Sequence, residues 1–227
     1  MFAYISQNAD KRILDALKKE GFEIVPLLPF VALENPTDTH ADMLLLSVGE
    51  TLFVHRDYPC EIKGFEKIIK INEPLSCKYP NDVLLNIAIV GKNVLANTKY
   101  ASETVIEYLQ NHGFFVHHVS QGYANCSTCI VSDNAIISAD TGIIEAAQKE
   151  GVDALKIDCG HISLHPYEYG FIGGSCGSFE NKMYFCGSLK YHPDGEKIRN
   201  FCKKHGKTVI ELCDAPLSDV GGILFQN

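Results

Sequence analysis

The sequence predicts a mixed α/β protein in which five similar units follow one another around a ring, each made of two antiparallel strands, a helix and a further strand. Three observations lead to this fold class. Five glycines, each followed by a short strand-like run, recur roughly 40 to 55 residues apart. Amphipathic helical patterns precede four of these glycines, and paired strand-like runs precede most of the helices. The five runs begin at Gly21, Gly64, Gly113, Gly151 and Gly206.

Four segments place their apolar residues on one helical face and end one residue before a glycine. Glycine there suits a helix C-terminus, where the chain needs a positive φ. The segment before Gly64 is short and contains Pro59, so we expect its helix to be reduced or lost. The predicted helices are Asp10–Glu20, Ser102–His112, Thr141–Glu150 and Pro193–His205.

Paired apolar runs separated by turn residues precede the helices of the later units and the expected reduced helix. Gly49-Glu50, Gly91-Lys92 and Asp133-Asn134 form the three short turns. The predicted strand pairs are Met43–Val48 with Thr51–Val54, Val83–Val90 with Asn93–Ala96, Cys129–Val131 with Ala135–Ser138, and Phe171–Gly174 with Met183–Cys186.

The two ends of the chain predict how the first unit is completed. Met1–Ser6 is a single strand before the first helix, and Val220–Phe225 is a strand with no helix after it. We therefore expect the C-terminal strand to close the N-terminal unit, giving a five-fold pseudosymmetric propeller of ββαβ units without exposed inner edges. The alternative is an open α/β sheet with helices on one or both faces. No Pro/Gly/Ser-rich linker divides the chain, which predicts one domain over residues 1–227.

Composition excludes several classes of protein. The net charge of −8 argues against nucleic acid or an anionic membrane as the main partner. The N-terminus lacks the basic and apolar regions of a signal peptide, and no apolar run is long enough to span a membrane. Nine cysteines, an odd number in a chain that can build its own core, favour reduced thiols and a cytoplasmic location.

The predicted architecture resembles the pentein fold of the guanidino-group-modifying enzymes: arginine deiminases, dimethylarginine hydrolases, amidinotransferases and agmatine deiminases. His40-Ala41-Asp42, at the start of a predicted strand, is similar to the His-x-Asp of that superfamily. The resemblance implies that His40 is a general acid/base and that Asp42 holds a guanidinium group. Alternation along a strand would project both side chains to one face, and the alternative is a polar loop with a capping Asp.

One departure from the superfamily pattern concerns the nucleophile. Its members carry a catalytic Cys in a Gly-rich C-terminal strand, whereas this chain has Phe225 at about that place, after Gly221-Gly222. The usual thiol is therefore expected to be absent.

Other polar residues lie at the predicted starts of the inner strands and would converge on the ring axis. Among them, Cys126 follows an Asn and precedes hydroxyl residues, and Cys176 lies in a Gly-rich segment. Either thiol is a candidate nucleophile with His40, and for each the alternative is a structural thiol. The candidate substrate-binding residues are Asp42, Asp82, Asn125 and Asp219.

Motifs for metals and cofactors are weak. Cys126-Ser-Thr-Cys129 has CxxC spacing, but Cys159 and His161 do not complete a zinc signature. Gly173-Gly174-Ser-Cys-Gly177 lacks the Lys-Ser/Thr of a phosphate-binding loop. We expect neither a metal nor a cofactor.

Two functional hypotheses remain open. The first is a hydrolase or transferase that attacks a guanidino or amidino carbon with a Cys thiolate. The second is a non-catalytic protein that binds a small molecule on the same scaffold, which the loss of the C-terminal Cys favours. In both, the ligand is expected to be a small cationic compound, because the convergent side chains include several carboxylates.

Overall fold

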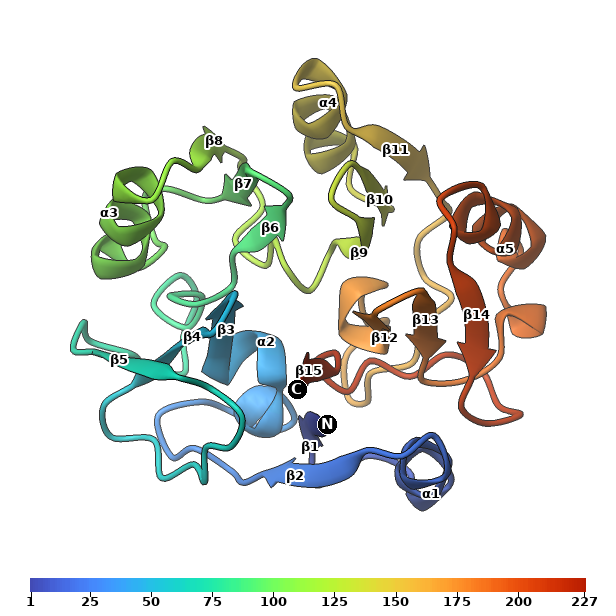
Figure 1. Cartoon of the computed structure of the whole chain (residues 1–227), viewed down its shortest axis with the longest axis horizontal. Coiled ribbons are helices and arrows are strands. Elements are labelled where there is room, and N and C mark those ends of the chain that lie inside the picture. Colours follow the sequence, from blue (N-terminus) through green and yellow to red (C-terminus); the bar gives the residue numbers. More distant parts are fainter.

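A computed structural model describes all residues, 1–227. Its strands form five three-stranded sheets arranged around a centre (Figure 1). In each sheet an inner strand pairs antiparallel with a middle strand, and the middle strand pairs parallel with an outer strand. From inner to outer, the sheets are β15 (Leu224–Gln226), β1 (Phe2–Ser6) and β2 (Glu23–Leu27); β3 (Leu45–Val48), β4 (Thr51–His55) and β5 (Lys67–Ile71); β6 (Ala88–Val90), β7 (Asn93–Ala96) and β8 (Phe115–His118); β9 (Cys129–Ser132), β10 (Ala135–Ser138) and β11 (Asp153–Lys156); and β12 (Cys176–Phe179), β13 (Lys182–Phe185) and β14 (Thr208–Glu211).

The predicted pairing of the chain ends is confirmed. β15 pairs antiparallel with β1, with Ala3 opposite Phe225, so the C-terminal strand completes the first sheet. Both chain ends lie near the middle of the molecule in Figure 1.

The four predicted helices are confirmed. They connect the middle and outer strands of four units, and the glycine after each C-cap residue has a positive φ. Asp10, Ser102 and Asp140 act as N-caps whose side chains accept backbone hydrogen bonds. The helices are α1 (Lys11–Lys19), α3 (Glu103–Asn111), α4 (Thr141–Lys149) and α5 (Gly195–Lys204).

Each of these helices packs between its own sheet and that of the neighbouring unit. Val105 and Leu109 of α3, for example, share a core cluster with Val94 of β7 and with Phe53 of β4. As predicted, no helix joins β4 to β5. Phe30 and Tyr58 from loops pack there instead, beside the strands of the first two sheets.

A turn precedes the inner strands, and here several predicted boundaries were wrong. Residues Ala41–Leu44 form the helical turn α2 rather than strand, and residues 83–87 contain a turn at 84–85 and no strand before β6. Residues Gly173–Ser175 form a 3-10 turn before β12. These turns are too short to show helical periodicity, and their apolar residues resemble strand residues in the sequence.

Hydrogen bonds link the segments that precede the five inner strands in succession around the axis. They run from Asn86 Nδ2 to Asp42 O (3.1 Å), from Asn125 N to Asn86 Oδ1 (2.7 Å), from Gly174 N to Cys126 O (3.1 Å), from Gly222 N to Gly174 O (2.7 Å) and from Asp42 N to Gly221 O (3.0 Å). All five units therefore hold the same small group of polar residues in place. No helix in the structure combines the length and the apolar character needed to cross a membrane.

Candidate functional site

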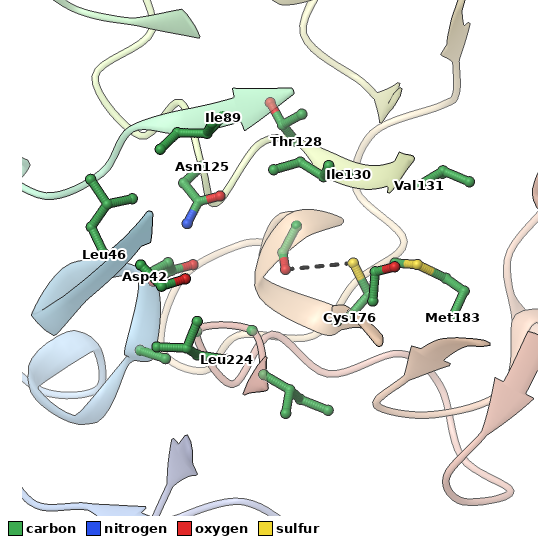
Figure 2. A pocket seen from close by; sticks show the side chains of 18 of the residues that line it. Asp42, Leu46, Ile89, Asn125, Thr128, Ile130, Val131, Cys176, Met183 and Leu224 are labelled. Atoms are coloured by element: carbon green, nitrogen blue, oxygen red, sulfur yellow. Dashed lines mark hydrogen bonds between the residues drawn. The ribbon is translucent and has the colours of Figure 1, made fainter. Parts of the chain in front are cut away.

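The candidate residues divide between two cavities. The larger, of about 530 Å³, is lined by His40, Asp82, Cys126 and Asp219. The smaller, of about 320 Å³, lies among the inner strands and is lined by Asp42, Asn125 and Cys176 (Figure 2). Because residues adjacent in the sequence line different cavities, the segments before the inner strands separate the two spaces.

His40 and Asp42 come together, although not through strand alternation. His40 is the N-cap of α2 and Asp42 lies within that helical turn. The His40 Nδ1 atom is 4.0 Å from Asp42 Oδ1 and 3.7 Å from Asp219 Oδ1, with all three side chains buried. Burial lowers the pKa of His40 to about 4, so the imidazole is neutral near pH 7.

Asp42 and Asp219 form a buried carboxyl pair without a cationic partner. Asp219 accepts hydrogen bonds from the backbone N–H groups of Phe171 (2.8 Å) and Gly221 (3.0 Å). Neither carboxyl oxygen of Asp42 has a hydrogen-bond partner. Burial raises the pKa of both groups, and the negative charge of Asp219 raises the pKa of Asp42 further. The pair consequently tends to retain a proton near neutrality.

Gly221 allows this close arrangement. Its φ is +79°, and a Cβ at this position would overlap the side chain of His40. The Gly-Gly sequence that resembles the superfamily pattern therefore has a local purpose here: it brings the backbone against His40.

The Cys126 thiol lies in the large cavity beside the carboxyl pair but makes no hydrogen bond with His40. Its Sγ accepts a hydrogen bond from Asn86 Nδ2 at 2.9 Å. Burial raises the pKa of Cys126 well above its ordinary value, and the negative charges of Asp42 and Asp219 raise it further. The thiol is therefore protonated near pH 7, and the expected Cys–His pair is not formed in this structure.

Asn86, which the sequence analysis overlooked, positions Cys126. The side chain is 1% exposed, and its Oδ1 accepts from the backbone N–H groups of Asn125 (2.7 Å) and Cys126 (3.1 Å). Its Nδ2 donates to Cys126 Sγ and to the Asp42 carbonyl. A lone amide within the apolar run from Val83 to Val90 was the signal that could have revealed it.

Cys176 has different surroundings from Cys126. It is the first residue of β12, packs in an apolar cluster with Cys129, and donates a long hydrogen bond to the Gly173 carbonyl (3.6 Å; dashed line in Figure 2). Burial raises the pKa of Cys176, and no hydrogen bond or ion pair joins it to His40.

Two further predicted residues take separate positions. The Asp82 Oδ2 atom accepts from the Tyr123 hydroxyl at 2.7 Å, whereas its Oδ1 atom is buried without a partner, and burial raises the pKa of this carboxyl. Asn125 is held through its backbone by Asn86, and its side chain lies at the small cavity.

Phe225 lies outside both cavities. Its ring packs against Phe22 (centroids 4.6 Å apart), Tyr184 (5.1 Å) and Phe179 (5.6 Å). The C-terminal segment thus brings Asp219, rather than residue 225, to the candidate site. No group of three or more His, Cys, Asp or Glu side chains is arranged to hold a metal ion.

Comparison with solved structures shows which proteins share this fold. A mutant of DDAH from Pseudomonas aeruginosa in complex with citrulline is similar over 93% of this chain and 82% of its own, with a TM-score of 0.56 and 14% identity. An agmatine deiminase from C. jejuni is similar over 94% of this chain and 87% of its own, with a TM-score of 0.54 and 13% identity. An inosamine-phosphate amidinotransferase from Streptomyces griseus is similar over 92% and 75%, with a TM-score of 0.50 and 12% identity. The chain shares the fold of these structures, the pentein fold, as the resemblance in its sequence predicted.

The chain belongs to the family of unknown function DUF6873, whose sequence profile matches residues 4–224. No curated protein matches it.

Proposed function

We propose that the large cavity binds the guanidinium or amidinium group of a small organic cation. The observation that carries this proposal is the buried carboxyl of Asp219, which lines this cavity beside neutral His40, is paired with Asp42 of the small cavity, and has no cation of its own. Two buried carboxyls beside each other favour a ligand that supplies positive charge. A planar cation with several N–H donors matches Asp219 and the unpartnered Oδ1 atom of Asp82, which both line the large cavity.

His40 suits the same ligand in its neutral form. The ring makes no hydrogen bond within the protein, so an imidazole nitrogen is free to accept a hydrogen bond from a bound N–H group. A charged histidine would repel the cation, and burial keeps this ring uncharged down to a pH of about 4.

The ligand test compares butylguanidine with butylurea, a neutral molecule of nearly the same shape, by calorimetric titration. We expect butylguanidine to bind at least about tenfold more tightly, because only the guanidine carries the charge that the carboxyl pair lacks. Equal affinity for the two compounds, or no binding of either, would contradict the proposal.

A second candidate function is covalent chemistry at Cys126, favoured by the position of this thiol in the same cavity as His40 and Asp219. The sulfur would attack the central guanidinium carbon as its proton passes to His40. That proton would leave with the departing amine, and a water molecule would then cleave the carbon–sulfur bond to give a urea-type product.

The charge of the ligand bears on this second function. A bound cation beside Cys126 would offset the negative charge of the carboxyl pair, which adds to burial in raising the pKa of the thiol. The test is formation of a urea-type product from guanidines by wild-type protein and by Cys126→Ser. Product formed equally by both proteins, or by neither, would leave ligand binding without chemistry at Cys126.

A further inference from the structure

The wall of the large cavity carries a series of aromatic rings that the guanidinium proposal does not use. Tyr79 lies 5.7 Å from Tyr123, and Tyr123 stacks with Phe171 at 6.1 Å between ring centroids. Tyr169 meets Phe171 edge to face at 6.5 Å. Tyr167 completes the set. The rings come from three separate segments, so the fold gathers them at one place.

Three of these rings are exposed at the outer part of the cavity. Tyr79 is 51% exposed, Tyr167 50% and Tyr169 38%. Two exposed carboxylates, Glu34 and Glu168, line the cavity with them. Aromatic faces together with carboxylates form a favourable environment for an ammonium group.

The charges that line the cavity are strongly unequal. Glu34, Asp82, Glu168 and Asp219 are acidic, whereas the exposed side chain of Lys78 is the one basic group. No arginine lines the cavity to hold a carboxylate in the bidentate manner. A ligand that carried a carboxylate would face four acidic side chains with one mobile lysine to offset them.

We propose that the ligand is a dication without a carboxylate: a guanidine or amidine joined by a short chain to an ammonium group. This inference rests on the proposed function and names the class of ligand. The guanidinium end lies at Asp219 and Asp82, and the ammonium end lies among the exposed tyrosines with Glu34 and Glu168. A cavity of about 530 Å³ lies within the range of pockets that hold a whole small ligand rather than a single functional group.

Three compounds with the same guanidine and the same chain length test the class. Butylguanidine ends in a methyl group, agmatine ends in an ammonium group, and arginine carries both an ammonium and a carboxylate. In calorimetric titrations we expect agmatine to bind about tenfold more tightly than butylguanidine, and arginine to bind more weakly than agmatine by at least a similar factor.

A double variant, Glu34→Gln with Glu168→Gln, tests where the ammonium group of the ligand binds. It is expected to lower agmatine affinity to about that of butylguanidine and to leave butylguanidine affinity unchanged. The matched control is Glu103→Gln with Glu107→Gln on α3, which removes the same charge at exposed positions outside the cavity.

The outcomes distinguish the dication ligand from the guanidinium site on which it depends. Arginine binding as tightly as agmatine would overturn the dication class, and loss of arginine binding in Lys78→Gln would then identify the group that receives the carboxylate. Equal binding of butylguanidine and agmatine would overturn the second cation site and leave the guanidinium site standing. Failure of all three compounds to bind would refute the proposed function itself.

Discussion

Cys126 and Cys176 have the same type of side chain near the same central axis, yet their surroundings differ. Cys126 lies three residues before β9, whereas Cys176 is the first residue of β12. The residue in the fifth unit that corresponds to Cys126 is therefore Gly173, and the residue in the fourth unit that corresponds to Cys176 is Cys129. Cys129 and Cys176 pack together in one apolar cluster.

This shift of three residues relative to the strand places Cys126 in the candidate site and Cys176 in the apolar core. At Cys126 the chain forms a turn, and the polar side chains of Asn86, Asp42 and Asp219 from other units are its neighbours. At the position of Cys176 the chain is strand, and its neighbours are apolar. A thiol near the axis is thus not sufficient for a functional site, because the polar groups that could act on it are held by the turns.

The largest effect expected in the Cys126 region comes from Asp219→Asn. This substitution removes the carboxylate of the buried pair that lines the large cavity, so we expect butylguanidine affinity to fall about a hundredfold, as when a buried charge loses its partner. Calorimetric titration measures the loss. Asp38→Asn, a carboxyl with one buried, unpartnered oxygen outside both cavities, is the control and is expected to bind normally. Equal affinity of Asp219→Asn and wild type would remove Asp219 from the site.

Asn86→Ala tests what holds the Cys126 turn in place. The substitution leaves the backbone N–H groups of Asn125 and Cys126 buried without an acceptor, so the free energy of unfolding is expected to fall by at least about 2 kcal/mol. Urea denaturation measures it. Asn97→Ala, which loses a bond donated to the Ser120 carbonyl and a long one accepted from the Lys99 N–H, is expected to have a smaller effect. A smaller loss for Asn86→Ala than for Asn97→Ala would contradict the positioning role.

Alkylation distinguishes the two thiols directly. Chloroacetamidine carries a cationic head, and chloroacetamide is its neutral counterpart. We expect the amidine to modify Cys126 at least about tenfold faster, because its charge is drawn to Asp42 and Asp219 and lowers the pKa of the thiol. Peptide mapping by mass spectrometry separates this site from the exposed Cys77 and Cys159.

The alkylation experiment has matched controls in the same chain. Cys176→Ser should behave like wild type, and Cys126→Ser should lose the fast reaction. A fast reaction that persists in Cys126→Ser and maps to Cys176 would reverse the comparison between the two regions.

The smallest effect concerns stability against pH. Burial and a neighbouring charge raise the pKa of Asp42 to about 8 in the folded state, so the folded protein binds more protons than the unfolded chain between about pH 4 and about pH 8. The Asp42 contribution to stability should therefore fall as the pH rises through this range, by at most about 1.4 kcal/mol per pH unit for one group, and it is unopposed above about pH 6.5. His40 acts in the opposite sense, since its depressed pKa costs stability only as the pH falls below about 6.5.

Asp42→Asn removes the titrating group, so its stability should depend less on pH over the upper range than that of the wild type. Thermal unfolding at several pH values measures both proteins. An unchanged pH dependence in the variant would assign the titration to another group.

The repeat was predictable from the sequence because it depends on strong local signals. Gly21, Gly113, Gly151 and Gly206 each lie where a helix ends with a positive φ, and amphipathic patterns of nine or more residues precede them. The pairing of β15 with β1 followed from a simple count of strands at the two ends of the chain.

The site was predictable only in part. His40, Asp42, Cys126 and Asp219 are brought together as polar residues that precede inner strands, but the turns that orient them are too short for a periodic pattern. Asn86 was missed because a single amide in an apolar run gives no sign of which backbone groups it will bind. The contact expected between a thiol and His40 depends on distances across units, which spacing in the sequence does not determine.

Proton release on ligand binding reports directly on the buried carboxyl pair. We expect Asp42 and Asp219 to retain a proton in the free protein and a guanidinium cation to displace it. Butylguanidine would be titrated calorimetrically near pH 7 in two buffers with different ionisation enthalpies, with wild type and Asp42→Asn compared. Wild type should release a substantial fraction of a proton on binding, and Asp42→Asn should release less. Binding by wild type with no proton released, or with proton uptake, would rule out this displacement.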